Sequence, residues 1–229
     1  MKLIIGDKEV NITNRELQNG YISEGREGSV YEYKGDALKI YNEDPYVDRL
    51  SEENAKRLKR IPTNRILTPT ELIYDENGNY IGYTTPFLIE ENKERISLYT
   101  IDKLKEESEI LKEDIRILSD NEVELDDLNI CNLILSNGLY ICDSGSFRFR
   151  KELDKEKLYK NNIYEINYLI IKLLFHDYLS LTRKEKEELV RIFESTSDFY
   201  MDKFLEDEQI NPKQKIKPFV KKYVNKQMW

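Results

Sequence analysis

The chain changes its pattern of hydrophobic residues near residue 95, and this change limits the folds that it can adopt. Before that point, short runs rich in β-branched and aromatic residues alternate with turns, and Asn77-Gly78 separates two such runs within residues 71–85. Asn-Gly in this setting is typical of a β-hairpin. After residue 95, apolar residues recur at the three- and four-residue spacing of an α-helix. The sequence therefore predicts an α+β chain whose first part is rich in strands and whose second part is mainly helical.

Four helices are predicted from this spacing and from capping signals. One interrupts the strands at residues 46–61, and a second covers residues 101–118. A third, at residues 162–175, is apolar nearly all round, which is typical of a helix buried inside its domain. Thr182 and Glu185 have the spacing of a capping box and predict the start of the fourth. The face of the first helix that we expect to be buried carries Leu50, Asn54, Leu58 and Ile61.

Length and composition suit a globular protein and argue against some functions. The 229 residues suffice for one large domain or two small lobes with a real core. The 36 Lys and Arg against 44 Asp and Glu give a net charge of −8, which argues against general nucleic-acid binding. The apolar run at the N-terminus is too short for a signal peptide, and no stretch has the length of a membrane span. We therefore expect a cytoplasmic protein, or a secreted effector that acts in a host cytosol.

Polar residues surround two short apolar runs at residues 125–145. Asp127 and Asn132 precede the first run, Ser-Asn-Gly separates the runs, and Asp143 follows the second. If the runs pair as a hairpin, Asn132 and Asp143 lie at the same end of it. Carboxylate and amide oxygens are hard ligands that suit Mg²⁺, so this end could hold metal-bound phosphate. The alternative at this point is a surface hairpin with polar ends.

A second group of residues, in the strand-rich part, suits the same ligand. Gly25 and Gly28 lie in a turn between two predicted strands, and Lys39 lies on the strand that follows. Glycines let backbone N–H groups approach phosphate oxygens, and a lysine can reach those oxygens as a point charge. Taken alone, the same residues also fit an ordinary hairpin with a lysine nearby.

Together the two groups resemble the signature of the protein-kinase-like superfamily, over roughly residues 19–175. That signature is a glycine-rich loop followed by valine, an Ala-x-Lys strand, an Asp-Leu-x-x-x-Asn segment and an Asp-x-Gly segment. The resemblance implies a bilobal kinase-like fold with a β-rich N-lobe (residues 1–88) and a reduced helical C-lobe (residues 89–229), in which the hairpin at 125–145 is catalytic. The matching residues are Gly25, Gly28, Val30, Ala37, Lys39, Asp127, Leu128, Asn132, Asp143 and Gly145.

The resemblance further implies an enzyme, a phosphotransferase that depends on ATP and Mg²⁺. Its catalytic residues would be Asp127, Lys39 and Asn132, with Asp127 as the base that accepts the proton of the attacking hydroxyl. Asn132 and Asp143 would bind Mg²⁺, and Lys39 would bind the nucleotide phosphates. Phosphoryl transfer needs mainly alignment and neutralised charge, which these side chains can supply.

Members of this superfamily pair the strand lysine with a glutamate of the N-lobe helix. We expect Glu53 to be that partner of Lys39, in preference to Glu52, because Glu53 lies near the apolar face formed by Leu50 and Leu58. The alternative is that both glutamates are solvated residues of the helix surface.

The rest of the nucleotide site is also implied by the resemblance. Adenine would lie against Val30 and Ala37, and Thr85 would line the back of its site. The residues after Thr85 would offer backbone groups to the base. Proline has no N–H, so Leu88 is expected to donate in preference to Pro86. An ordinary strand end is the alternative for this segment.

The chain also departs from the superfamily's pattern. Leu125-Asp126 stand where many protein kinases have His-Arg, and Asn129 stands where Ser/Thr kinases usually have lysine. Asn162 stands where an aspartate is expected at the start of the buried helix. No Ala-Pro-Glu lies between Asp143 and Asn162, so the peptide-docking platform of regulated kinases is shortened or absent. These departures predict a compact kinase of a bacterial, viral or effector type.

Three functions are therefore weighed. The first is a minimal Ser/Thr-type protein kinase that transfers phosphate to a protein hydroxyl. The second is a small-molecule kinase for a sugar, aminoglycoside or similar hydroxyl. The third is a nucleotide-binding pseudokinase. The presence of Lys39, Asp127, Asn132 and Asp143 together argues against the third, because a pure binding module has no physical need for all four. The acceptor and the oligomeric state do not follow from the sequence.

Overall fold

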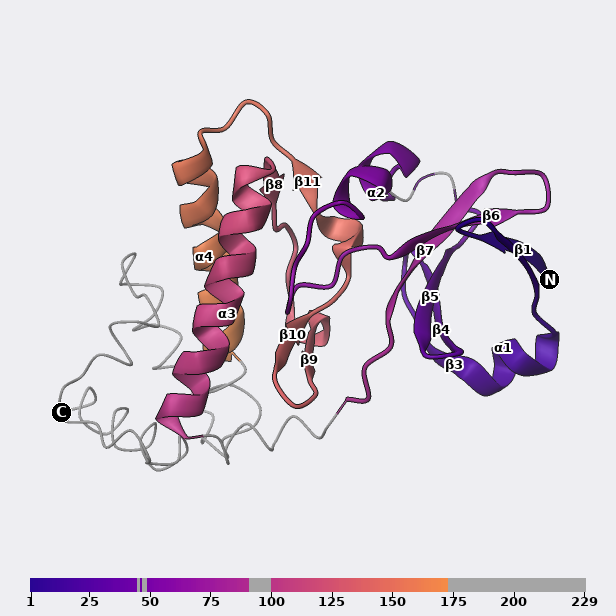
Figure 1. Cartoon of the computed structure of the whole chain (residues 1–229), viewed down its shortest axis with the longest axis horizontal. Coiled ribbons are helices and arrows are strands. Elements are labelled where there is room, and N and C mark those ends of the chain that lie inside the picture. Colours follow the sequence, from indigo (N-terminus) through magenta and orange to yellow (C-terminus); the bar gives the residue numbers. More distant parts are fainter. Residues whose placement is uncertain (45, 47–48, 91–99, 173–229) are drawn as a thin grey trace.

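The protein has an α+β structure. The computed structural model describes residues 1–44, 46, 49–90 and 100–172, and everything below refers to these residues. A seven-stranded antiparallel sheet forms one side of the molecule, and two long helices form the other (Figure 1). The predicted α+β class, with strands first and helices later, is confirmed. The helix predicted to start near Thr182, and residues 173–175 of the preceding one, lie outside the described residues.

The large sheet contains all the strands of the first part of the chain. Its order is β2-β1-β6-β7-β5-β4-β3, and each neighbouring pair is antiparallel. The predicted β6–β7 hairpin is confirmed: Gly78 has φ +82° in its turn, and the Asp75 carboxylate accepts hydrogen bonds from the backbone N–H groups of Asn77 and Asn79. The strands are β1 (Lys2–Ile5), β2 (Lys8–Asn11), β3 (Tyr21–Glu24), β4 (Gly28–Tyr33), β5 (Asp36–Tyr41), β6 (Glu71–Asp75) and β7 (Tyr80–Pro86).

Two short helices accompany this sheet, where one was predicted. Helix α1 (Asn14–Gly20) was not expected, although Thr13 and Glu16 form a capping box at its start. Helix α2 (Glu52–Leu58) is shorter than the predicted 46–61, because the Ser51 side chain caps it and accepts a hydrogen bond from the backbone N–H of Asn54. The apolar residues expected on its buried side, Leu50, Leu58 and Ile61, are buried.

The second part of the chain places a small hairpin against two long helices. Helix α3 (Ile101–Asp120) and helix α4 (Lys155–Lys172) lie side by side. The hairpin predicted within residues 125–145 is confirmed as β9 (Leu133–Leu135) paired with β10 (Leu139–Ile141), with Leu133 opposite Ile141. A second small pair joins β8 (Val123–Glu124) to β11 (Arg148–Phe149), and single 3₁₀ turns precede and follow the hairpin, η2 (Ile130–Asn132) and η3 (Ser144–Ser146).

The hydrophobic core connects the sheet to the helices. One face of the sheet closes over a small cluster formed by Leu3, Ile12, Leu38 and Ile73. The other face belongs to a larger cluster that continues through α2 into the hairpin, α3 and α4, and Tyr83 and Leu133 are two of its members. In Figure 1, α2 and the β9–β10 hairpin lie between the sheet and the long helices. The face of the sheet that is directed toward the helical part is thus the one that carries Tyr83.

The segment between α2 and β6 ties the two parts together. The buried Asp114 carboxylate of α3 accepts hydrogen bonds from the backbone N–H groups of Asn64, Arg65 and Ile66, at 2.8, 2.5 and 2.9 Å. The same segment binds β10, because Ile141 donates its N–H to the Arg65 carbonyl and accepts from the N–H of Leu67, both at 2.8 Å. Asp114 therefore fixes the segment that carries the chain from α2 into the sheet.

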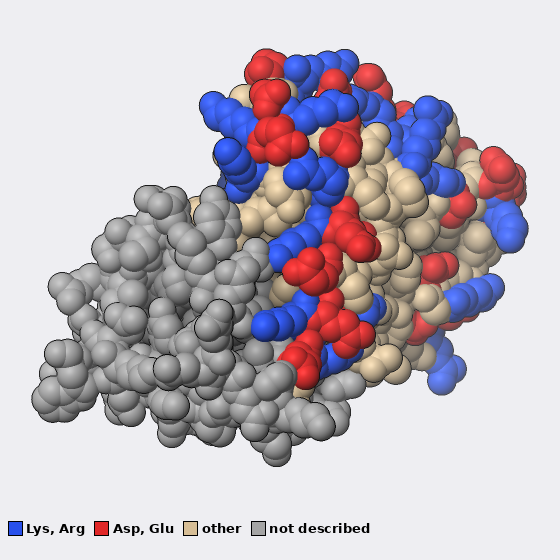
Figure 2. Space-filling view, turned by 60° about the vertical axis from the view of Figure 1, so that its left-hand side comes forward, with Lys and Arg blue, Asp and Glu red and all other residues tan. Residues whose placement is uncertain are grey.

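The surface is strongly charged, and the two signs are mixed. On the face shown in Figure 2, basic and acidic side chains alternate. Several are linked as ion pairs along α3, among them Lys103–Glu106 and Arg116–Glu156. Of the helices described, none combines the length and the apolar character that crossing a membrane requires.

Candidate functional site

Lys39 lies at the centre of the candidate site. Its ammonium pairs with the Glu27 carboxylate at 2.5 Å and with the Asp143 carboxylate, which is 104 positions away in the sequence. The Lys39 side chain is only 11% exposed, whereas that of Asp143 is 38% exposed. Lys39 comes from β5, and Asp143 lies two residues after the end of β10. The structure thus brings together two residues that the sequence assigned to the same site.

The carboxylates keep Lys39 charged despite its burial. Burial by itself lowers the pKa of this ammonium, but the Asp143 and Glu27 carboxylates outweigh it, so the pKa is raised above the ordinary value of 10.5. Burial raises the pKa of Tyr83, so its hydroxyl is neutral at neutral pH and the attraction comes from the two carboxylates. Lys39 is therefore a cation throughout the physiological pH range.

Gly145 leaves the space in which this ion pair forms. A Cβ atom at position 145 would lie 2.5 Å from Glu27 Oε2, 2.9 Å from Lys39 Nζ and 3.0 Å from Asp143 Oδ1. Such distances are shorter than van der Waals contact, so any side chain here would displace the three groups. The lack of a side chain at position 145 therefore leaves the room in which these three charged groups meet.

Asp143 and Asp127 both have backbone angles that side chains other than glycine rarely adopt. Their φ values are +68° and +53°. Aspartate tolerates this left-handed region better than most residues, at a cost of roughly 1–3 kcal/mol. Asp127 is exposed, and its backbone N–H donates to the Asp126 carboxylate at 3.0 Å. The two predicted catalytic and metal-binding aspartates are thus also two of the strained positions of the chain.

The backbone of Asn132 lies close to Asp143, while the Asn132 side chain forms a hydrogen bond with Asn129. Its carbonyl accepts a hydrogen bond from the N–H of Cys142, at 2.7 Å, which puts Asn132 beside the residue that precedes Asp143. The predicted meeting of Asn132 and Asp143 at one end of the hairpin is confirmed to this extent. The Asn132 side-chain oxygen accepts from the N–H of Asn129 at 2.7 Å, and Asn132 is 8% exposed.

The glutamate that pairs with Lys39 is Glu27, and the prediction of Glu53 for this contact is wrong. Glu53 is exposed on α2, whose buried residues are Ala55 and Leu58. The carboxylate of its neighbour Glu52 is bound by residues other than Lys39.

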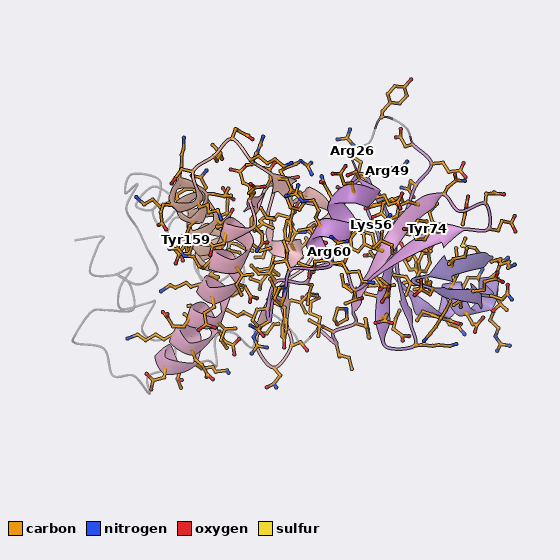
Figure 3. The ribbon with its side chains drawn as sticks, turned by 45° about the horizontal axis from the view of Figure 1, so that its top comes forward. Arg26, Arg49, Lys56, Arg60, Tyr74 and Tyr159 are labelled. Atoms are coloured by element: carbon orange, nitrogen blue, oxygen red, sulfur yellow. The ribbon has the colours of Figure 1, made fainter. Side chains whose placement is uncertain are left out.

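Glu52 accepts hydrogen bonds from Lys56 at 2.5 Å and from the Tyr74 hydroxyl at 2.9 Å. Figure 3 labels these two donors, Lys56 of α2 and Tyr74 of β6. The sequence did contain a signal for Glu27, because it is a carboxylate within the glycine loop and close to the lysine strand.

The glycine loop connects β3 to β4 and is held in a compact form. The Gly25 N–H donates to the Gly28 carbonyl at 2.9 Å, and the N–H of Asn42 donates to the Glu27 carbonyl at 2.9 Å. Gly28 is buried, and a Cβ on it would lie 2.2 Å from the Ile40 carbonyl oxygen. The backbone at position 28 thus approaches β5 more closely than any other residue type would allow.

The register of the sheet places the residues predicted to contact adenine on the same face as Lys39. Val30 and Tyr83 are directly opposite Lys39 on the two neighbouring strands, and Ala37 is opposite Thr85. Residues directly opposite one another, and residues two apart on one strand, share a face of a sheet. The structure therefore brings Val30, Ala37, Lys39 and Thr85 together. Leu88, two residues beyond the end of β7, is partly buried.

Tyr83 and Ser144 are members of the site that the sequence did not indicate. Both hydroxyl groups are buried, and neither forms a hydrogen bond of standard geometry with another described residue. Burial raises the pKa of Tyr83, and the neighbouring Ser144 hydroxyl acts in the opposite direction. Tyr83 can be recognised as a site residue from its position opposite Lys39. That position follows from the strand register, which the sequence alone does not give.

Asn162 anchors the segment that leads to Asp127. It is fully buried in α4, and its side-chain oxygen accepts from the N–H of Leu125 at 2.8 Å. Its amide nitrogen donates to the Ser119 hydroxyl at 3.0 Å and to the Val123 carbonyl at 2.8 Å. Asn162 stands where the resemblance leads us to expect an aspartate, and it holds the backbone two residues before Asp127.

Comparison with known proteins adds no relative: no protein-family model matches the chain, and no curated protein sequence matches it significantly.

Proposed function

We propose that the protein is a phosphotransferase of the protein-kinase-like type, which uses ATP and Mg²⁺ and transfers phosphate to a protein hydroxyl. One observation carries the proposal. Lys39 and Asp143 meet at a single ion pair although they come from β5 and from the end of β10. A lysine that binds phosphates and an aspartate that binds the accompanying metal ion must be neighbours in such an enzyme.

The sheet supports the nucleotide part of the proposal. Val30, Ala37 and Thr85 line the face that carries Lys39, and each is partly buried. A planar base needs apolar contacts of this kind, next to groups that bind its phosphates. The bilobal arrangement proposed here places this face toward the helical part and the base between them.

The ligands near Asp143 fit a magnesium ion that arrives with the nucleotide. Asp143 uses Oδ1 for Lys39, which leaves Oδ2 for a metal ion, and its side chain is 38% exposed. Mg²⁺ is commonly held by one or two carboxylates together with substrate phosphates. No cluster of three or more His, Cys, Asp or Glu suited to a metal occurs in the described part of the chain, so the proposed ion would take its other ligands from the nucleotide phosphates. Asn132 would contribute its side-chain oxygen by turning away from Asn129. Bound there, Mg²⁺ would neutralise charge on the phosphates.

Asp127 is the proposed base. It is exposed and lies on a segment whose backbone Asn162 holds in place, so an acceptor hydroxyl can reach it from solvent. Its carboxylate would orient the hydroxyl and accept the hydroxyl proton as the bond to phosphorus forms. A positioned base of this kind contributes about 10²–10⁴-fold to the rate of such reactions.

The test is transfer of labelled phosphate from ATP in the presence of Mg²⁺. The wild type and Asp143→Ala are incubated alone, with a generic protein acceptor, and with sugar or aminoglycoside acceptors. Label on protein that is lost in Asp143→Ala supports the proposal, and label only on a small molecule would support a small-molecule kinase. Nucleotide binding, seen as a thermal shift, without transfer to any acceptor would support a pseudokinase.

A further inference from the structure

Glu27 occupies a position that the proposed function does not explain. It lies in the glycine loop between Gly25 and Gly28, and its side chain is directed at Lys39 and is 24% exposed. The loop that would have to approach nucleotide phosphates thus presents a carboxylate to the phosphate-binding lysine.

The charges at this point do not favour an anion. Two carboxylates, Glu27 and Asp143, share the single positive charge of Lys39, so the three side chains together carry one net negative charge. A phosphate oxygen would have to bind the same ammonium that Glu27 binds. Like charges this close repel strongly in a partly buried site. A phosphate group and the Glu27 carboxylate therefore compete for Lys39.

The loop holds Glu27 in this position. The N–H of Asn42 binds the Glu27 carbonyl at 2.9 Å, and the Asn42 side chain reaches the carbonyls of Gly25 and Arg26, each at 3.4 Å. Gly145 provides the space into which the carboxylate fits, since a Cβ there would lie 2.5 Å from Glu27 Oε2. The contact between Glu27 and Lys39 is therefore supported by the hydrogen bonds of the loop and by the space that the Asp-x-Gly segment leaves.

We infer that the Glu27 carboxylate takes the place of a ligand phosphate on Lys39, so that a nucleotide must displace it. This inference rests on the proposed function. It makes Glu27 a determinant of specificity: ligands that bring polyphosphate charge and a divalent cation can replace it, and ligands that lack phosphate gain nothing from its removal.

The experiment compares Glu27→Gln with Glu24→Gln. Glu24 ends β3, is exposed and carries the same charge, so Glu24→Gln controls for the change in net charge. Binding of Mg·ATP is measured by isothermal titration. We expect Glu27→Gln to lower the Kd about tenfold, a gain of ~1.4 kcal/mol, and Glu24→Gln to change it less than about twofold. Adenosine, which has no phosphate for Lys39, should bind all three proteins equally.

The outcomes separate this inference from the function on which it rests. If the wild type binds Mg·ATP and Glu27→Gln binds it more weakly, Glu27 positions Lys39 and the inference is overturned. Equal changes of the Kd for Mg·ATP in Glu27→Gln and Glu24→Gln also overturn it, because the loss of one negative charge at long range would then explain both. If neither the wild type nor Glu27→Gln binds Mg·ATP, the proposed function itself fails. Binding that is seen only in Glu27→Gln supports both.

Discussion

Asn162 of α4 accepts a hydrogen bond from the backbone N–H of Leu125, at 2.8 Å, and thereby fixes the chain two residues before Asp127. The same amide donates to the Val123 carbonyl at 2.8 Å. One buried side chain thus holds Val123 of β8 and the residue just after this strand, Leu125, at the entry to the candidate catalytic segment. An amide is needed because it must accept from one backbone group and donate to another.

We expect Asn162→Asp to destabilise the protein, although an aspartate is what the superfamily's pattern would place there. The carboxylate would keep the contact to Leu125 but would face the Val123 carbonyl without a hydrogen to donate. Leaving a buried acceptor unpaired in this way costs about 1–3 kcal/mol, and Asn162→Ala should cost more. Urea unfolding measures the change, with the exposed Lys160→Ala of the same helix as control. A variant Asn162→Asp as stable as the wild type would contradict this account.

A second prediction concerns Asp114, whose carboxylate binds the backbone of residues 64–66. Asp114→Asn would direct an NH₂ group at a backbone N–H donor and remove the charge that strengthens the remaining hydrogen bonds. Hydrogen bonds to a charged group are worth about 1.5–3 kcal/mol each, so a loss of ~3 kcal/mol or more in the free energy of unfolding is expected. Glu113→Gln, at the exposed neighbouring position, is the matched control and should have little effect.

Much of this architecture could be predicted from local sequence signals. The Asn77-Gly78 turn fixed the β6–β7 hairpin, and the Ser-Asn-Gly turn fixed β9–β10, because each turn sets the pairing of the strands beside it. Lys39 and Asp143 could be assigned to one site only because both match the signature that the chain resembles. Helix α1 was missed: it is seven residues long, and the only buried residue in it is Gly20, so it has no apolar periodicity to detect.

The partner of Lys39 could not be predicted in the same way. The choice between Glu53 and Glu27 depends on how α2 is rotated and on how the glycine loop turns, and neither is a local property. Helix α2 begins only at Glu52, and its buried face carries Ala55 and Leu58, which leaves Glu53 exposed. Tyr83 was missed for a similar reason, because its place opposite Lys39 follows from the register between β5 and β7.

A third prediction follows from the space at Gly145. Gly145→Ala should weaken Mg·ATP binding and destabilise the protein by about 1–3 kcal/mol, because its Cβ would overlap the groups around Lys39. The nearest of these groups is Glu27 Oε2, at 2.5 Å. Removing the Glu27 side chain should therefore restore part of the lost stability and Mg·ATP affinity. A double-mutant cycle of Gly145→Ala with Glu27→Ala should give a favourable coupling energy. Strictly additive effects would show that the two residues do not share this space.

A fourth prediction concerns alkaline pH. The folded-state pKa of Lys39 is raised above 10.5, so its ion pairs stabilise the folded protein fully below that value and are lost as the pH rises through the folded pKa. The difference in free energy of unfolding between the wild type and Lys39→Met should therefore be constant near neutral pH and shrink only above 10.5. Denaturant unfolding over the neutral and alkaline range measures this difference. A decline that begins near neutral pH would mean that another group is responsible.

The last prediction separates chemistry from structure at Asp127. Asparagine also tolerates a positive φ, and position 127, with φ +53°, is exposed, so Asp127→Asn should fold with nearly unchanged stability. It cannot accept a proton, however, and phosphate transfer should fall about 10²–10⁴-fold while the affinity for Mg·ATP stays within about twofold of the wild type. Asp126→Asn, at the exposed residue just before it, removes the same charge and should retain most of the activity. If Asp127→Asn transfers phosphate as fast as Asp126→Asn, then Asp127 is not the base, and the acceptor hydroxyl must be activated by another group.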